Sequence, residues 1–207
     1  MNVLFVHGMG RSSLSWATTL IRFRSRGIKT FVFGYSVALQ DFSAIVRSLV
    51  PVLVTLSKRG EYVLVGHSLG GVLLRAALHE MPLGAAMPKR LFLLGSPVVS
   101  SRLARQLSRS MLFRAVTRDC GRLLGSEERM SSIPGTAVHT VAIAGTRGVH
   151  GRLSPFGSEP NDGIVSLGEV STGDFAEVIR VPVVHTLLPS SKRVAEIMLE
   201  RILGKEH

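Results

Sequence analysis

Residues 62–80 read YVLVGHSLGGVLLRAALHE, and this stretch decides the fold. Its first part, Tyr62–Val65, is an apolar run with the length of a buried strand. From Leu69 onward, apolar side chains recur at the spacing of an amphipathic helix. Residues 66–70 match the pattern G-x-S-x-G, in which a serine occupies a sharp turn from a strand into a helix. The stretch therefore predicts a strand, a tight turn that exposes Ser68, and a helix.

The spacing of the pentapeptide has a steric cause. Glycines at positions 66 and 70 let the strand and the helix approach each other without Cβ clashes. The start of the helix also brings free backbone N–H groups and a partial positive charge beside Ser68. A glycine-rich turn with an incidental serine is the alternative. We favour a catalytic Ser68, because a strand and a helix flank the motif and Gly71 extends it. The His67 side chain is expected to point away from the site and to have a structural role.

Further strands and helices alternate on both sides of this stretch. The sequence predicts strands at Val3–Val6, Lys29–Phe33, Tyr62–Gly66, Arg90–Leu94, Val138–Ala144 and Glu177–Val184. It predicts helices at Ser12–Arg26, Leu69–Glu80 and Pro189–Leu203. Another helix is expected to begin at Asp41, with a kink or break near Pro51. One or two further helices are expected within Ser100–Glu128. This order implies an α/β fold in three layers, with a doubly wound, mostly parallel sheet of about six strands.

Composition excludes several classes of protein. The 207 residues are 45% hydrophobic and 19% charged, which is an ordinary globular balance and fits one domain over 1–207. No repeat or low-complexity stretch is visible, and the longest apolar runs are too short to span a bilayer. We expect a cytoplasmic location, because Met1-Asn2 and the short Val3–Val6 run do not resemble a signal peptide and Cys120 is the only cysteine.

A serine nucleophile creates a tetrahedral oxyanion, which requires preorganised donors. One donor is the backbone N–H of the residue after the nucleophile, Leu69. The other is expected from the loop after the first strand, where residues 7–10 read HGMG. In that loop the N–H of Met9 is positioned to be the second donor, and the flanking glycines let the loop fold over the site. A plain turn is the alternative for this loop.

The serine also needs a neutral imidazole to accept its proton. Of the seven histidines, His185 follows the last predicted strand and precedes the last helix, which puts it at the carboxyl edge of the sheet. Ligands bind at that edge in open α/β sheets. His185 is therefore the predicted base, and His150, in the long loop of residues 146–161, is the second choice.

The base in turn needs a carboxylate that fixes its tautomer. Asp162 lies in NDGIV at residues 161–165, after the fifth predicted strand. The chain order Ser68, Asp162, His185 is the one expected when a G-x-S-x-G turn carries the nucleophile. A plain Asn-Asp-Gly turn is the alternative, and Asp174 and Glu159 are the other candidate acids.

These motifs together resemble the α/β-hydrolase superfamily, and they are similar to its compact bacterial lipases and esterases. The resemblance rests on residues 7–10, residues 66–71, residues 161–163 and His185, and so spans nearly the whole chain. It implies hydrolysis of acyl esters without a cofactor or a metal. The sequence departs from larger relatives because it begins at the strand before the HGMG loop. It also lacks an insertion between Leu94 and Val138 large enough for a multi-helix cap domain, so lid gating is not expected.

The whole chain has a net charge of +11, and its arginines are concentrated in residues 100–129. Arg102, Arg105 and Arg109 recur at helical spacing, beside apolar residues on another face. The pattern favours a solvated arginine face on a helix that packs against the sheet. Contact of a basic amphipathic helix with an anionic membrane surface is the alternative. Few aromatic residues and no binding motif accompany the charge, so nucleic acid is not an expected partner.

The combined prediction is a serine esterase whose acyl pocket is lined by Met9, Leu69 and the loop around Phe156. One alternative is a long-chain lipase or acyl-thioesterase that works at an anionic membrane. Another is a catalytically inactive binding module with the same fold. A small-molecule or lipid acyl ester is the expected ligand, and the chain is compatible with a monomer.

Overall fold

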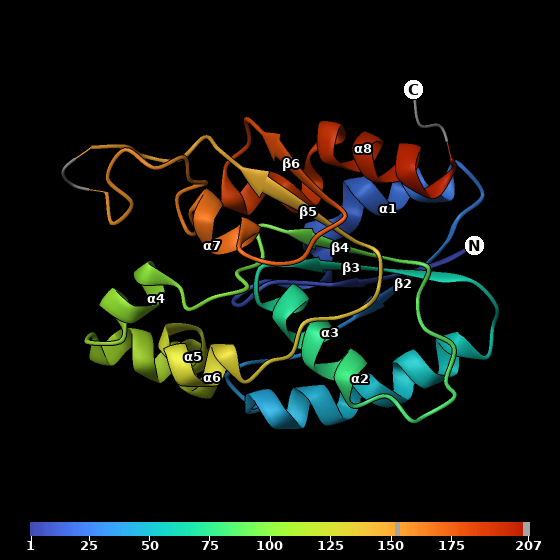
Figure 1. The fold of residues 1–207 in the computed structure, drawn as a ribbon, viewed down its shortest axis with the longest axis horizontal. Coiled ribbons are helices and arrows are strands. Elements are labelled where there is room, and N and C mark those ends of the chain that lie inside the picture. The colour runs from blue at the N-terminus through green and yellow to red at the C-terminus, as the bar shows by residue number, and fades with distance from the viewer. Residues whose placement is uncertain (152–153, 205–207) are drawn as a thin grey trace.

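The computed structural model describes residues 1–151 and 154–204, and its centre is one parallel sheet (Figure 1). Six strands lie in the order β2-β1-β3-β4-β5-β6. They are β1 (Asn2–Val6), β2 (Lys29–Phe33), β3 (Tyr62–His67), β4 (Arg90–Leu94), β5 (Thr140–Gly145) and β6 (Glu177–Val181). Every neighbouring pair is parallel. The predicted α/β fold with about six strands is confirmed.

Helices cover both faces of the sheet (Figure 1). One face carries η1 (Ser13–Trp16), α1 (Ala17–Arg24), η2 (His185–Ser190) and α8 (Lys192–Ile202). The other carries α2 (Phe42–Ser57) and α3 (Leu69–His79), with α5 (Met111–Gly125) beside α2. The remaining helices are α4 (Arg102–Leu107), α6 (Glu127–Ser131) and α7 (Leu167–Ser171). Strands and helices thus form the three layers that the sequence predicts.

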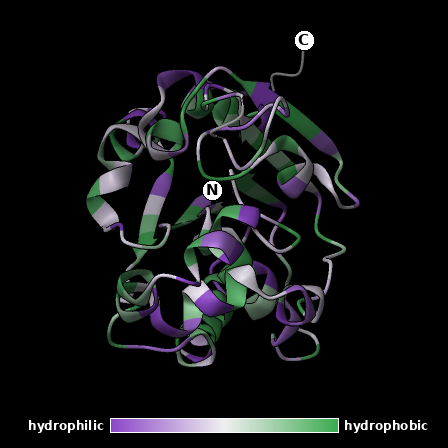
Figure 2. Ribbon diagram, turned by 90° about the vertical axis from the view of Figure 1, so that its left-hand side faces the viewer, coloured by the Kyte–Doolittle hydropathy of each residue, from purple (hydrophilic) through white to green (hydrophobic). Residues whose placement is uncertain are grey.

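The central strands β1, β3, β4 and β5 are largely apolar because both faces of the sheet are buried there, whereas the edge strands β2 and β6 are partly exposed. In β1, Leu4 and Val6 pack into the core under α2 and α3, whereas Val3 and Phe5 pack into the core under α1 and α8. This alternation follows from the two-residue period of a strand. Figure 2 shows hydrophilic and hydrophobic residues alternating along the helices, as expected for helices with one face on a core.

Helix α2 differs from the prediction, because it continues through Pro51 instead of breaking there. Pro51 lies on the exposed side of the helix. The carbonyl of Arg47, which loses its usual N–H partner to the proline ring, is on the same exposed side, where water can bind it. The buried stripe from Phe42 to Leu56 holds the helix on the sheet.

The arginine-rich segment forms three helices instead of the predicted one or two. Helix α4 ends at Leu107, so Arg109 is not on the same helix as Arg102 and Arg105. Helix α5 contains one non-helical residue, Arg118, with φ 48° and ψ −127°. Helix α7 was not predicted, because its five residues are too few to show a helical period.

Candidate active site

Ser68 occupies the strained turn that the sequence predicts. It lies between β3 and α3 with φ 52° and ψ −124°. Among the described residues, Ser68 and Arg118 are the only non-glycine residues with positive φ. Such a conformation is costly for a residue with a Cβ and is common at functional sites. Ser68 is partly exposed, although the residues on both sides of it are buried.

Three glycines make this turn possible because the chain is in close contact around it. A Cβ on Gly66 would collide with the backbone of Gly71, and a Cβ on Gly70 would collide with the carbonyl oxygen of Val6. Gly71 packs against Ser96. The Ser96 hydroxyl donates to the carbonyl oxygen of Ser68 at 2.8 Å and so holds the turn from the next strand.

The predicted acid and base form a buried pair. The Nδ1 atom of His185 lies 2.7 Å from Oδ2 of Asp162, and the two residues are 6% and 2% exposed. The other carboxylate oxygen of Asp162 accepts the N–H groups of Ile164 and Val165, at 3.0 and 2.9 Å. The backbone N–H of His185 donates to the carbonyl of Asp162 at 2.9 Å. These bonds fix the His185 ring with Nε2 as its free nitrogen.

Gly95 follows β4 and lies directly behind the Asp162–His185 pair. A Cβ at this position would be 2.9 Å from Oδ2 of Asp162 and 3.0 Å from Nδ1 of His185. Its φ of +52° is also a conformation that favours glycine. Sequence reasoning missed Gly95, although a glycine and a serine immediately after a buried strand were a usable signal.

His67 contacts both the backbone and the ring of His185. Its Nε2–H donates to the carbonyl oxygen of His185 at 3.1 Å, and the two ring centroids are 4.6 Å apart. Burial, followed by the charge of His185, holds the pKa of His67 well below its ordinary value, so the ring is neutral. His67 lines the same cavity as Ser68, so it does not point away from the site as predicted.

The loop after β1 forms a tight turn next to Ser68. The N–H of Arg11 donates to the carbonyl of Gly8 at 3.2 Å, and Gly10 has φ +67°. This geometry is that of a type II turn, whose third position needs positive φ. The turn bond uses the Arg11 N–H and does not involve the N–H of Met9. Leu69 is the first residue of α3, so its N–H has no partner within the helix.

His7 holds this turn in place through hydrogen bonds. Its Nδ1–H donates to the Gly8 carbonyl at 2.9 Å, and its Nε2 accepts the Tyr35 N–H at 3.4 Å. The Tyr35 hydroxyl donates to the His7 carbonyl at 2.8 Å, and the two rings stack with centroids 4.3 Å apart. Burial lowers the pKa of His7, which keeps the ring neutral and this tautomer in place.

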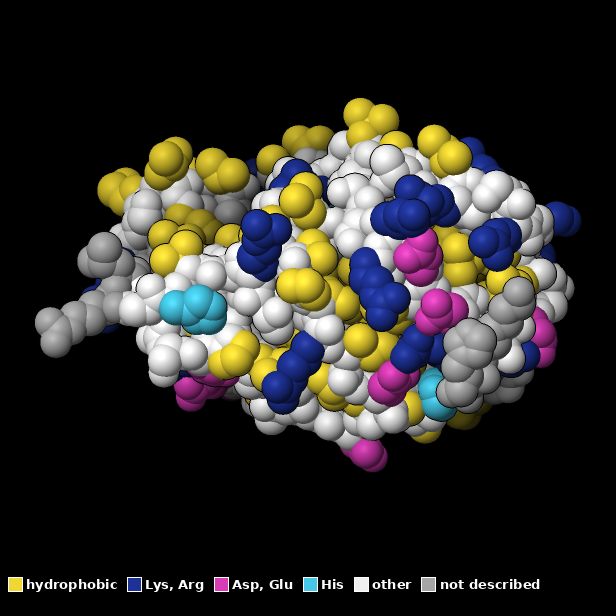
Figure 3. Space-filling view, turned by 90° about the horizontal axis from the view of Figure 1, so that it is seen from above, with side chains coloured by type: hydrophobic (Ala, Val, Ile, Leu, Met, Phe, Trp, Pro, Cys, Tyr) yellow, Lys and Arg dark blue, Asp and Glu magenta, His cyan; other side chains and the backbone are white. Residues whose placement is uncertain are grey.

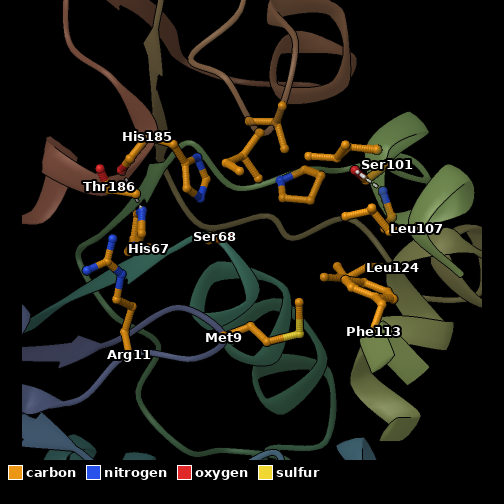
Figure 4. Close-up of a pocket in the computed structure, with 15 residues that line it drawn as sticks. Met9, Arg11, His67, Ser68, Ser101, Leu107, Phe113, Leu124, His185 and Thr186 are labelled. Atoms are coloured by element: carbon orange, nitrogen blue, oxygen red, sulfur yellow. Dashed lines mark hydrogen bonds between the residues drawn. The ribbon is translucent and has the colours of Figure 1, made fainter. Parts of the chain in front are cut away.

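A cavity of about 200 Å³ opens beside Ser68 (Figure 4). Ser68 and His185 both line it. One side is apolar and includes side chains from α4 and α5, namely Leu103, Ala104, Leu107, Phe113 and Leu124, together with Met9. The other side carries Arg11, His67, His185 and Thr186. The arrangement can hold an apolar group beside a serine with a paired histidine.

Several candidates from the sequence lie away from this cavity. Phe156 is buried under the guanidinium of Arg102, 5.2 Å from its ring centroid, and does not line the cavity. His150 and Asp174 are exposed elsewhere, and Glu159 pairs with Arg102. Within the described part of the chain, the structure brings Ser68, Asp162 and His185 together but not these residues.

Cys120 also lies outside the cavity. It lies on α5, and its side chain is fully buried in the core. Burial raises the pKa of its thiol to about 12, so the thiol is not ionised near neutral pH.

Two of the three arginines that were candidates for contact with a membrane are engaged within the protein. Arg102 pairs with Glu159 and Glu169, and Arg105 pairs with Glu127 at 2.8 Å. Glu169 also accepts the Arg102 backbone N–H at 2.6 Å and so caps the start of α4. These contacts tie α4 to the segment that carries Asp162.

In residues 1–151 and 154–204, no three His, Cys, Asp or Glu side chains gather as a possible metal site. No helix in the same ranges has the length and apolar character needed to cross a membrane.

Comparisons with known proteins are consistent with this geometry. A family model described as "Alpha/beta hydrolase family" matches residues 3–191. The search of curated proteins found no match. The structure is similar to a Bacillus licheniformis lipase in propeptide form, with a TM-score of 0.72 and 16% identity, over 97% of this chain and 50% of that one. The chain thus spans about half the length of that lipase.

Two other solved structures are similar at low identity. Phospholipase PlaB from Legionella pneumophila has a TM-score of 0.74 and 14% identity, over 98% of this chain and 58% of that one. ClbQ, from the colibactin NRPS/PKS pathway, has a TM-score of 0.66 and 16% identity, over 98% of this chain and 97% of that one. At these identities the likeness supports the fold.

Proposed function

Because this chain belongs to the alpha/beta hydrolase family, we propose that it is a serine hydrolase that cleaves carboxylic esters. The observation that carries the proposal is the buried pair of His185 and Asp162, 2.7 Å apart, in a cavity that Ser68 also lines. Hydrolysis of a short p-nitrophenyl ester by the purified protein, and its loss on replacement of Ser68, tests the proposal.

The proposed reaction has two halves. Ser68 Oγ attacks the acyl carbonyl carbon while Nε2 of His185 takes the hydroxyl proton, and Asp162 stabilises the imidazolium. The N–H groups of Met9 and Leu69 hold the oxyanion, and the alcohol leaves with the proton from His185. Water then loses a proton to His185 and attacks the acyl-enzyme. The acid is released as Ser68 regains its proton.

The apolar side of the cavity is the proposed acyl site. Leu107, Phe113 and Leu124 line it from α4 and α5. Its volume of about 200 Å³ is below the roughly 300–1,000 Å³ that is usual for pockets of drug-sized ligands. We therefore expect a preference for short and medium acyl chains, because longer chains would have to extend past Leu107 into solvent.

A chain-length series tests this acyl site. Replacement Leu107→Trp adds volume to the cavity wall at a residue that is 39% exposed, so the fold can accommodate it. We expect kcat/KM for an eight-carbon p-nitrophenyl ester to fall about tenfold, with little change for the acetate. Leu83→Trp, at a fully exposed residue outside the cavity, is the matched control. Equal loss for all chain lengths would contradict the assignment.

A lipid acyl ester or an acyl thioester at an anionic surface is a second candidate substrate. The helices that wall the cavity also expose Met111, Leu112 and Val116, at 84%, 75% and 56%. No Asp or Glu occurs from Met81 to Arg118, so the basic charge of this region has no acidic neighbours in sequence. On the face that carries α8, by contrast, basic and acidic side chains adjoin one another (Figure 3), as Lys192 and Glu196 do at 3.7 Å.

Vesicle binding separates this candidate from the small-ester proposal. If the second candidate is right, the protein should float with vesicles of equimolar phosphatidylcholine and phosphatidylglycerol at low salt, and not with pure phosphatidylcholine. The small-ester proposal requires no flotation. The double replacement Met111→Glu and Leu112→Glu should abolish flotation and leave hydrolysis of p-nitrophenyl acetate unchanged. Ile21→Glu, at a 68% exposed residue on α1, is the control. Flotation that persists in the double variant would exclude this surface.

A binding module without catalysis remains the alternative from another class of function. Failure of a fluorophosphonate probe to label Ser68 would support it. For location we propose the cytoplasm, since the single Cys120 fits a reducing compartment.

A further inference from the structure

The cavity beside Ser68 is chemically two-sided, and on its second side the cation Arg11 has no role in the reaction described above. In Figure 4, Met9, Leu107, Phe113 and Leu124 lie on one side of Ser68. The side chain of Arg11 lies on the other side, with Thr186 and His185. An ester bound with its acyl chain on the apolar side places its leaving group on the side of Arg11.

The position of Arg11 is fixed by the backbone. Its N–H closes the turn by donating to the Gly8 carbonyl at 3.2 Å, and it lies two residues after Met9. The guanidinium is close enough to His67 for its charge to contribute to the lowered pKa of that ring, behind burial and His185. The turn that places the Met9 N–H therefore also places a cation at the mouth of the cavity.

Arg11 is available for a ligand. The side chain is exposed, and within residues 1–151 and 154–204 no acidic side chain pairs with it. The carboxylate of the site, Asp162, is 2% exposed and is already bonded to His185. A net charge of +11 adds a long-range attraction for anions.

We propose that Arg11 binds a carboxylate or phosphate on the leaving group, so that the preferred substrates are acyl esters or thioesters of an anionic alcohol or thiol. A guanidinium donates two parallel N–H groups to such an anion. This inference rests on the proposed function and names the substrate class for the same site. Arg11 is a specificity-determining residue and takes no part in proton transfer.

A pair of substrates that differ only in charge tests the inference. The pair is 3-(butyryloxy)benzoate and 3-(butyryloxy)benzamide, which share the acyl group and nearly the same shape. We expect Arg11→Gln to lower kcat/KM for the benzoate about fivefold relative to the benzamide, mainly through KM. Arg11→Lys should retain most of the preference. Arg26→Gln, which removes one exposed charge outside the cavity, should have no effect on the ratio.

Two results would overturn the inference. One is an unchanged ratio in Arg11→Gln, and the other is an equal loss for both substrates, which would indicate a structural role. Binding of the products gives a readout that does not need turnover. We expect 3-hydroxybenzoate to bind more tightly than 3-hydroxybenzamide by calorimetry, and Arg11→Gln to remove the difference. Hydrolysis of neither ester would defeat the proposed function, while the calorimetry would still decide the role of Arg11.

Discussion

Replacement of Ser68 by alanine is expected to lower kcat for a short p-nitrophenyl ester by about 10⁴-fold or more. Without Oγ no acyl-enzyme can form, and only the donors and the cavity remain to assist water. The variant should fold, because alanine keeps the Cβ that already fits the turn at φ 52°. The hydrogen bond from Ser96 goes to the Ser68 carbonyl and does not depend on its side chain.

The control for this variant is Ser101→Ala, in the same cavity. Ser101 lines the cavity and its hydroxyl accepts the N–H of Ala104 at the start of α4, at 3.3 Å. Its loss weakens a helix cap by about 1 kcal/mol but removes no reacting atom. Fluorophosphonate should label the unmodified protein and Ser101→Ala, and should not label Ser68→Ala. Turnover retained in Ser68→Ala, with an unchanged thermal unfolding midpoint, would rule out the proposed chemistry.

Much of the fold could be predicted, because the sheet is buried on both faces. The central strand Arg90–Leu94 has the predicted bounds, since an apolar run with clear ends determines it. The edge strand Lys29–Phe33 also has the predicted bounds, although it is only partly buried. The single turn of α7 could not be predicted from periodicity. It forms through a capping box between Ser166 and Glu169, and Glu169 gains a further partner in Arg102, 67 residues earlier in the chain.

The candidate site was predictable for a topological reason. Parallel strands end at one edge of the sheet, so Ser68 after β3, Asp162 beyond β5 and His185 after β6 converge there. Loop side chains were not predictable in the same way. Phe156 lies in a long segment without a period, so nothing in the sequence fixes whether its ring faces the cavity or Arg102. Arg11 directly follows the HGMG loop, but that motif predicts only backbone N–H groups, so nothing in the pattern marked the Arg11 side chain as part of the site.

Replacement of Asp162 by asparagine is expected to lower kcat by about 10⁴-fold while leaving the fold intact. The amide oxygen can still accept the N–H groups of Ile164 and Val165. The amide nitrogen must then face Nδ1 of His185, where it donates instead of accepting. His185 is forced into the tautomer with its proton on Nε2, and this nitrogen can no longer take the proton of Ser68.

The competing acids provide matched controls for this variant. Asp174→Asn removes an exposed carboxylate and should keep full activity. Glu159→Gln weakens the ion pair with Arg102, so it should lower the thermal unfolding midpoint and leave kcat nearly unchanged. Asp162→Asn should do the reverse, with a large loss in kcat and an unfolding midpoint near that of the unmodified protein. If the loss in kcat followed Asp174 or Glu159 instead, the 2.7 Å contact between Asp162 and His185 would be structural, and another carboxylate would orient the base.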